Sequence, residues 1–222
     1  MSYFLSVPEA YDRWAASYDA YDNPMVFMAT QALPASLAAV AHGARVFEFG
    51  CGTGRNLAAL AALGAREVEG CDFSGGMLQQ SAAGHRTFRH DMTHPLTHPV
   101  TPADLVLFCL TLEHVETLDV PLASASRILA PGGRVAIFEI HPFLSLGGTA
   151  AHFVEADGTE IRMPTYPHTF STFLNAFARA GLGVESCREW RPCDLAAPAP
   201  AKVLKRGGEF PLLVEFILKK HE

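Results

Sequence analysis

The chain has 222 residues, of which 49% are hydrophobic and 18% charged, and its formal net charge is -6. This length and apolar content suit one α/β domain with a sizeable core. The negative net charge disfavours nucleic acid as a substrate, because contacts with a phosphate backbone require clustered cations. We recognise no run of about 18 apolar residues and no basic leader before an apolar core, so we expect neither a membrane span nor a secretory signal.

The five cysteines are scattered along the chain and form no C-x-x-C pair. They are Cys51, Cys71, Cys109, Cys187 and Cys193, and three of them stand inside apolar, strand-like runs. A cysteine in such a run behaves as a small hydrophobic residue. We therefore expect reduced core thiols in a cytoplasmic protein.

The first predicted helix covers residues 32–41, which are rich in Ala and Leu and stop before a glycine. Strands and helices then alternate. Strands are predicted at Arg45–Phe49, 67–71, Arg86–Arg89, 104–110 and 134–140, and helices at 56–63 and 121–129. Most of these strands are short apolar runs, which suit a parallel sheet covered on both faces. The alternation predicts a three-layer α/β sandwich.

Residues 141–168 interrupt this alternation with Gly147-Gly148, Asp157-Gly158 and three prolines. A long excursion in a compact domain is often a lid or binding loop, so we expect a lid insertion after the fifth strand. A hairpin turning at Asp157-Gly158 is one form that it could take.

A helix is predicted from about Thr169, closed by Gly181. Its spacing predicts one face formed by Phe170, Phe173, Leu174 and Phe177. Two further strands are predicted at residues 183–190 and 211–219.

The strongest local signal is a strand ending in Glu48-Phe49-Gly50, followed by Cys51-Gly52-Thr53-Gly54 and a helix. Alternating glycines let the backbone turn tightly and approach a ligand closely. A dinucleotide site would show G-x-G-x-x-G, whereas this loop is G-x-G-x-G with an acid two residues before it. The difference favours an aminoacyl-nucleoside over a pyrophosphate, and a glycine turn without any ligand is the alternative.

Three further elements fit a nucleoside. Asp72 lies 22 positions after Gly50, where Rossmann-type sites place an acid for the ribose hydroxyls. Phe73 and Met77 would offer apolar faces to an adenine ring. Asp91-Met92 follows the third strand, where Asp91 could accept a hydrogen bond from the adenine amino group.

These motifs together resemble the class I S-adenosylmethionine-dependent methyltransferases, small-molecule type. The resemblance covers residues 11–219 and rests on E-F-G-C-G-T-G, G-C-D-F-S-G-G-M-L, H-D-M, D-L-V-L-F-C-L-T-L-E-H-V and L-A-P-G-G-R-V-A-I-F-E. It implies a single methyltransferase domain over residues 1–222. Its sheet would have seven strands, mostly parallel, with the last strand antiparallel. It also implies S-adenosylmethionine as methyl donor.

The resemblance and the residue patterns together predict the donor site. The expected donor-binding residues are Tyr11, Trp14, Tyr18, Glu48, Gly50, Cys51, Gly52, Gly54, Asn56, Asp72, Phe73, Met77, Asp91, Met92 and Phe108. Tyr11, Trp14 and Tyr18 belong to Y-D-R-W-A-A-S-Y-D, which looks like the N-terminal motif that folds over the donor in several small-molecule members. Residues 1–44 would then cover the donor. The alternative is a helix whose aromatic side chains only pack on the domain.

Two rival functions remain compatible with the glycine loop. A nicotinamide-dependent oxidoreductase could share Asp72, although the sequence has no Tyr-x-x-x-Lys pair for hydride transfer. A non-catalytic ligand-binding protein could use the same fold, because fold does not fix function. No metal is expected, since Pro95 and Pro99 interrupt the spacing of His85, His90, His94 and His98.

The acceptor is expected to be a small, partly apolar molecule, methylated by in-line displacement. No D/N-P-P-Y motif follows the fourth strand, as it often does in enzymes that methylate nucleic acid amino groups. The predicted lid offers Phe143, Leu144, Phe153, Ile161, Met163 and Tyr166 to cover it. Methylation at oxygen, nitrogen or carbon stays open, and we expect a monomer or homodimer.

Three histidines are candidates to bind or deprotonate the acceptor: His141 as first choice, then His114 and His168. His141 and His114 follow strands and should lie at the carboxyl edge of the sheet. Histidine titrates near neutrality and suits this proton transfer. Positioning alone could also suffice, without a base.

Overall fold

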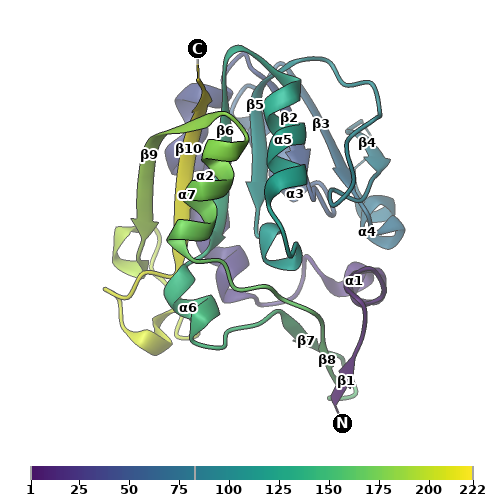
Figure 1. The fold of residues 1–222 in the computed structure, drawn as a ribbon. Helices are drawn as coiled ribbons and strands as arrows, with labels where there is room; N and C mark the ends of the chain where they lie inside the picture. Colours follow the sequence, from purple (N-terminus) through teal and green to yellow (C-terminus); the bar gives the residue numbers. More distant parts are fainter. Residues whose placement is uncertain (1, 83, 222) are drawn as a thin grey trace.

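The central sheet has seven strands in the order β4-β3-β2-β5-β6-β10-β9 (Figure 1). The computed structural model describes residues 2–82 and 84–221. The strands are β2 Arg45–Phe49, β3 Glu67–Asp72, β4 Arg86–Arg89, β5 Ala103–Cys109, β6 Leu129–Ile140, β9 Leu182–Trp190 and β10 Leu213–Lys220. β10 runs antiparallel to both β6 and β9, and the pairs from β4 to β6 are parallel. The predicted mostly parallel sheet with an antiparallel last strand is confirmed.

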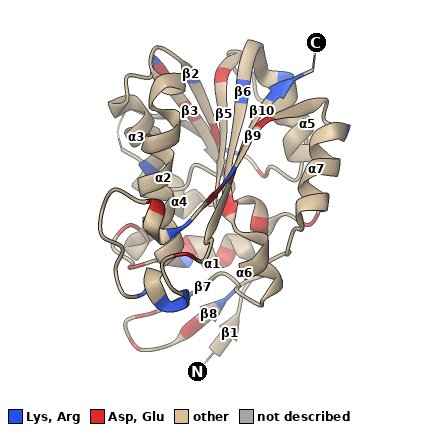
Figure 2. Ribbon diagram, turned by 90° about the vertical axis from the view of Figure 1, so that its left-hand side faces the viewer, with Lys and Arg blue, Asp and Glu red and all other residues tan. Residues whose placement is uncertain are grey.

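Helices cover both faces of this sheet (Figure 2). Helices α5 (Asp119–Ile128) and α7 (Phe170–Arg179) pack on one face, and α2 (Pro24–Ala41) and α3 (Arg55–Ala62) on the other. The three layers are therefore as predicted.

Strand β6 shows why the strands of the central sheet consist of continuous runs of apolar residues. Val135 and Ile137 belong to the core under α5 and α7, whereas Ala136 and Phe138 belong to the core under α2 and α3. Successive side chains point to opposite faces of a strand, so covering both faces requires apolar residues at every position. Burying such a side chain contributes about 1.5 to 3 kcal/mol.

The excursion after β6 contains a short helix and a hairpin. Helix α6 (Pro142–Leu146) was not predicted, whereas β7 (His152–Val154) and β8 (Glu160–Arg162) form the hairpin around the Asp157-Gly158 turn. Gly158 has a φ of +84°, which favours glycine, and the Asp157 carboxylate accepts a hydrogen bond from the Thr159 amide at 2.8 Å.

β8 also pairs in parallel with the unpredicted strand β1 (Ser2–Phe4), making a separate three-stranded sheet. The N-terminal strand therefore lies against the insertion that follows the fifth strand of the central sheet (Figure 1).

The first predicted helix begins too late. α2 starts at Pro24, and the side chain of Asn23 accepts a hydrogen bond from the Met25 amide at 2.9 Å. An N-cap followed by proline in the first turn is a helix start signal. With 18 residues and a mean hydropathy of 1.4, α2 has the length and composition of a membrane span, so the expectation that no such run exists was wrong. In this structure its Met28 and Leu33 lie in the core against the sheet.

Two further expectations are corrected. Leu174 is 48% exposed although Phe173 and Phe177 on α7 are buried, because it stands at the border of the apolar stripe. Cys187 and Cys193 are exposed rather than core thiols, since Cys187 lies on the edge strand β9 and Cys193 in the turn after it. Cys51, Cys71 and Cys109 are buried, and all five cysteines are free thiols.

Candidate active site

A first cavity of about 220 Å³ opens at the carboxyl ends of β2, β3, β4 and β5. This is the edge where ligands bind in open α/β sheets. Predicted residues that line it are Tyr11, Tyr18, Gly50, Cys51, Gly52, Asn56, Asp72, Phe73, Met77, Asp91 and Met92. Its other lining residues were not among the predicted donor-binding residues: Val7, Pro8, Thr53, Arg55, Thr93, Cys109, Leu110, Thr111, His114 and Val115.

The glycine loop has two different reasons for its glycines. Gly50 has a φ of +70°, and a β-carbon there would collide with the side chain of Thr111. Gly52 has a φ of +54°, but a β-carbon would meet no protein atom within 4 Å. The backbone at Gly52 is therefore open toward the cavity, which leaves room for a ligand to approach it closely.

Asp72 holds the loop in place from the end of β3. Its Oδ2 accepts a hydrogen bond from the Gly52 amide at 2.9 Å, and its Oδ1 accepts one from the Ser74 amide at 2.8 Å. Burial raises the pKa of Asp72. An ionised carboxylate has about four acceptor sites, so Asp72 retains acceptor capacity for a hydroxyl group of a ligand.

Asp91 also lines the cavity but is partly engaged. Its Oδ1 accepts hydrogen bonds from the amide of Thr93 at 2.9 Å and from its hydroxyl at 2.7 Å. Oδ2 lies 3.5 Å from the Nδ1 of His94. The carboxylate is 51% exposed, so it retains acceptor capacity toward a ligand.

Four of the predicted donor-binding residues do not line the first cavity. Glu48 lies behind it, with Oε1 accepting a hydrogen bond from the Asn56 side chain at 2.7 Å, and burial raises the pKa of Glu48 to about 8. Gly54 caps α3 with a φ of +78°, and a β-carbon there would lie 2.7 Å from Ser81 Oγ. Phe108 stacks on Phe49 in the core, with ring centroids 5.0 Å apart. Trp14 lines a second cavity instead.

The N-terminal segment Tyr11 to Asp19 is tied across the first cavity by two aspartates. Asp12 Oδ1 accepts hydrogen bonds from the Ser74 hydroxyl at 2.6 Å and from the Gly76 amide at 2.9 Å. The Ser74 hydrogen bond lowers the pKa of Asp12. Asp19 Oδ1 accepts a hydrogen bond from the Thr53 hydroxyl at 3.0 Å. One end of the segment is thus fixed to the loop after β3 and the other to the glycine loop.

A second cavity of about 410 Å³ adjoins the first, and the two share Tyr11, Tyr18 and Leu110. Trp14, Tyr21, Met25, Glu113, Ile140, Leu144, His152, Lys202, Lys205 and Arg206 are among its other lining residues. Leu110 has a φ of +53°, a conformation that is rare and costly for leucine. Such strain often marks functional positions, and here it lies where the cavities meet.

His114 and Tyr11 form a hydrogen-bonded pair at the first cavity, with Tyr11 Oη 2.9 Å from His114 Nε2. The Nδ1 of His114 lies 3.0 Å from the carbonyl oxygen of Pro164, which can only accept. Nδ1 therefore carries the proton and Nε2 accepts from the tyrosine hydroxyl. Burial lowers the pKa of His114 to about 4 and raises the pKa of Tyr11 well above its usual range. Both side chains are neutral near pH 7.

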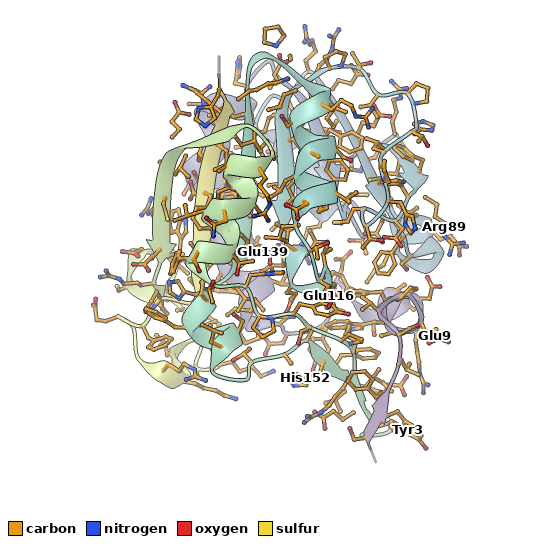
Figure 3. All side chains as sticks on the ribbon, viewed as in Figure 1. Tyr3, Glu9, Arg89, Glu116, Glu139 and His152 are labelled. Carbon is orange, nitrogen blue, oxygen red and sulfur yellow. The ribbon has the colours of Figure 1, made fainter. Side chains whose placement is uncertain are left out.

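Glu113 was not a predicted site residue, yet it lines the second cavity and its Oε1 lies 4.0 Å from His114 Nε2. Burial, together with the nearby Glu139, raises the pKa of Glu113 to about 8. Glu139 lies at the lower end of the sheet, above His152 (Figure 3). Its Oε1 accepts hydrogen bonds from the amides of Thr111 and Leu112 at 2.8 and 2.7 Å. Glu139 therefore holds the loop that carries Glu113 and His114.

The other two candidate histidines line neither cavity. His141 is fully buried, its Nδ1 accepts a hydrogen bond from the Phe143 amide at 3.2 Å, and its Nε2 lies 2.8 Å from Glu189 Oε1. His168 Nε2 lies 2.9 Å from the Val115 carbonyl oxygen and 3.2 Å from that of Leu112. The rings of both are engaged in holding neighbouring segments together.

The predicted lid residues also separate into groups. Leu144 lines the second cavity, whereas Phe153, Ile161 and Met163 form a small core with Trp14. Trp14 and Phe153 stack with centroids 4.6 Å apart, so the hairpin supports the wall of the second cavity from behind. Phe143 is 59% exposed, and neither it nor Tyr166 lines the cavities.

The comparisons with known proteins agree with this architecture. A family model described as a methyltransferase domain matches residues 47–137. An uncharacterised methyltransferase of Emericella nidulans is 28% identical and aligns over 85% of this chain and 82% of its own length.

Two solved structures illustrate the similarity of fold. An S-adenosylmethionine-dependent methyltransferase from Mesorhizobium loti is 24% identical with a TM-score of 0.70, covering 87% of this chain and 98% of that one. A complex of DhpI with SAM and HEP is 22% identical with a TM-score of 0.66, covering 95% and 94%.

Proposed function

We propose that this chain, whose residues 47–137 match a methyltransferase domain, is a class I S-adenosylmethionine-dependent methyltransferase, and that it methylates a small, partly apolar molecule bound in the second cavity. The observation that carries this proposal is the meeting of two cavities at Tyr11, Tyr18 and Leu110. Two reactants held on either side of such a junction can be aligned for direct transfer. The second cavity suits a small organic molecule in size and is bounded largely by apolar side chains.

The first cavity fits the donor. Gly52 leaves open space above the loop for the methionine part, and Asp72 retains acceptor sites for the ribose hydroxyls. Phe73, Met77, Asp91 and Met92 would surround the adenine ring. When bound, S-adenosylmethionine supplies an electrophilic methyl group, transferred in line as the acceptor's lone pair forms the new bond and sulfur retains the pair of the old one.

The N-terminal segment would exclude water from the junction. Tyr11 and Tyr18 lie between the two cavities, and the hydrogen bonds of Asp12 and Asp19 hold the segment closed. A dry junction strengthens every hydrogen bond that positions the reactants. Residues 7–26 and the insertion at 141–168 then act as the cover, whereas the rest of the N-terminal region expected to cover the donor includes α2, which packs against the sheet.

Of the three histidines, only His114 stays a candidate for contact with the acceptor. Its Nε2 carries a lone pair near neutral pH, and an acceptor that displaced the Tyr11 hydroxyl could donate its proton there. Glu113, beside it on the wall of the second cavity, is a second group able to exchange a proton. Positioning could supply much of the acceleration in either case. We also propose a cytoplasmic enzyme, monomeric or homodimeric.

The experiment is a transfer assay with donor labelled in its methyl group. Three acceptor classes are offered: a panel of small aromatic and aliphatic molecules, an oligonucleotide, and a protein extract. Label is expected in the small-molecule panel. Transfer only to nucleic acid or protein would refute the proposed acceptor class. Oxidation of NADPH by the same preparation would instead favour an oxidoreductase.

A further inference from the structure

We propose that the acceptor carries an anionic group, which Lys205 and Arg206 bind at the rim of the second cavity while its apolar body lies against Trp14 and Tyr21. This inference rests on the proposed function, because it treats the second cavity as the acceptor site. It names a substrate class: a small aromatic or otherwise apolar molecule with a carboxylate or phosphate-like group.

The charge of the rim is the first argument. Lys202, Lys205 and Arg206 all line the second cavity, and the last two belong to the 3₁₀ turn Val203–Arg206. Lys202 is paired, since its Nζ lies 2.8 Å from Asp22 Oδ2. Within residues 2–82 and 84–221, Lys205 and Arg206 form no ion pair. In Figure 2, blue ribbon positions, which mark Lys and Arg, lie beside β7 in the lower part of the molecule.

The acidic residues that line the second cavity do not neutralise Lys205 and Arg206. Asp22 and Glu113 are the acids that line the second cavity in the described part of the chain, and Asp22 is already paired. Burial raises the pKa of Glu113 to about 8, so its carboxyl is mostly protonated at neutral pH and adds little negative charge. The second cavity is therefore electropositive inside a chain whose net charge is -6. Such a local field favours an anion and opposes a cationic acceptor.

The walls indicate the rest of the molecule. The rings of Trp14 and Tyr21 meet edge to face, with centroids 5.1 Å apart, and Met25 and Leu144 also line the cavity. These side chains offer an apolar surface but few hydrogen-bonding groups. An apolar body with one charged end matches both the walls and the rim. The guanidinium of Arg206 can bind either a carboxylate or a phosphate through two parallel hydrogen bonds.

The test measures binding of four probes to the full chain saturated with S-adenosylhomocysteine. Phenylacetate and phenyl phosphate are the anionic probes, phenylacetamide is the neutral one and phenethylamine the cationic one. Ligand-observed NMR gives each affinity at low and at high salt. We expect at least one of the two anions to bind about tenfold more tightly than phenylacetamide. Anion binding should weaken with salt, because the rim is exposed to solvent.

Variants then locate the anion. Lys205→Glu and Arg206→Glu should each weaken anion binding about tenfold and leave the affinity for the amide unchanged. Lys220→Glu is the matched control, since Lys220 is also exposed and lies at the end of β10, outside the cavity lining. Unchanged binding of S-adenosylhomocysteine shows that each variant is folded.

The inference is overturned if the anions bind no better than the amide, or if the two rim variants behave like Lys220→Glu. Donor binding without anion binding would refute only the substrate class. If S-adenosylhomocysteine does not bind, the probes are titrated into the chain alone, and anion binding there would refute only the proposed function. Comparison of phenylacetate with phenyl phosphate identifies the preferred anionic group.

Discussion

Asp12 accepts a hydrogen bond from the hydroxyl of Ser74 at 2.6 Å, although 62 positions separate the two residues in the sequence. Ser74 caps α4 (Gly75–Gln80) and lies two residues after Asp72, the last residue of β3. The contact therefore joins α1 (Val7–Trp14) to the edge of the first cavity. Asp19 makes the corresponding contact with Thr53 on the other side.

We predict that Asp12→Ala and Asp19→Ala each raise the dissociation rate constant of S-adenosylhomocysteine several-fold. Loss of one charge-assisted hydrogen bond costs about 1.5 to 3 kcal/mol and would free one end of the covering segment. Stopped-flow measurement of ligand release gives the rate. Asp119→Ala is the control, because Asp119 pairs with Arg179 away from both cavities. If Asp12→Ala and Asp19→Ala release the ligand at the same rate as Asp119→Ala and wild type, the segment does not retain the ligand.

Asp72→Ala should weaken binding of S-adenosylmethionine by about 1.5 to 3 kcal/mol, the value of hydrogen bonds to a charged acceptor. The variant also loses the contacts that hold the Gly52 and Ser74 amides. Asp104→Ala is a matched control, since Asp104 accepts a hydrogen bond from the Arg45 amide at the start of β2. If calorimetry gives both variants the same affinity for S-adenosylmethionine as wild type, Asp72 does not bind the ribose.

The imidazole of His114 is predicted to stay neutral, with the proton on Nδ1, down to about pH 4. The Pro164 carbonyl oxygen fixes this tautomer and burial opposes the charged form. Nitrogen-15 NMR of the imidazole rings reports both the tautomer and the titration. A ring that carries its proton on Nε2, or that titrates near 6.5, would contradict the hydrogen bond with Tyr11.

Glu113→Gln should stabilise the protein progressively as the pH rises from 5 to 8. In the unfolded chain this carboxyl ionises near its ordinary pKa of 4.5, whereas in the folded protein its pKa is about 8. Between these values the unfolded state binds fewer protons, so wild type loses stability with rising pH by at most about 1.4 kcal/mol per pH unit from this group. Glutamine removes that slope.

The measurement is the melting temperature of wild type and Glu113→Gln across this pH range. The difference between them should be small near pH 5 and grow toward pH 8. Glu116→Gln serves as control, because Glu116 is exposed and close in sequence. A difference that does not change with pH would show that Glu113 is ionised normally in the folded chain.

The sequence predicted the elements whose stability depends on local pattern. Arg45–Phe49 and Arg86–Arg89 match β2 and β4 at both ends, and the hairpin turn at Asp157-Gly158 is present. Strand β1 could not be predicted, because three residues gain strand structure only by pairing with Glu160–Arg162, far along the chain. Pairing between distant segments leaves little trace in local sequence.

The candidate site likewise contains some residues that the sequence predicted and others that it did not. The sequence predicted that the glycine loop and Asp72 lie at one site, and both line the first cavity, because positive φ values at fixed spacing require glycine and β3 ends at Asp72 beside the loop. Glu113 was not, since its burial depends on the insertion and the N-terminal segment folding over it. His141 does follow the fifth strand as expected, but β9 places Glu189 beside its ring and draws it away from both cavities.

The central claim, that the donor lies over the glycine loop, is tested most directly by calorimetric titration of S-adenosylmethionine into wild type and Gly52→Val. A valine at a φ of +54° is strained and its side chain would enter the open space above the loop. Gly132→Val is the control, because Gly132 has a φ of +75°, nothing within 4 Å of a β-carbon and no place in the cavity lining. Both changes should cost about 1 to 2 kcal/mol of stability. We predict one donor bound per chain in wild type and in Gly132→Val, and none in Gly52→Val. Undiminished binding in Gly52→Val would contradict the placement.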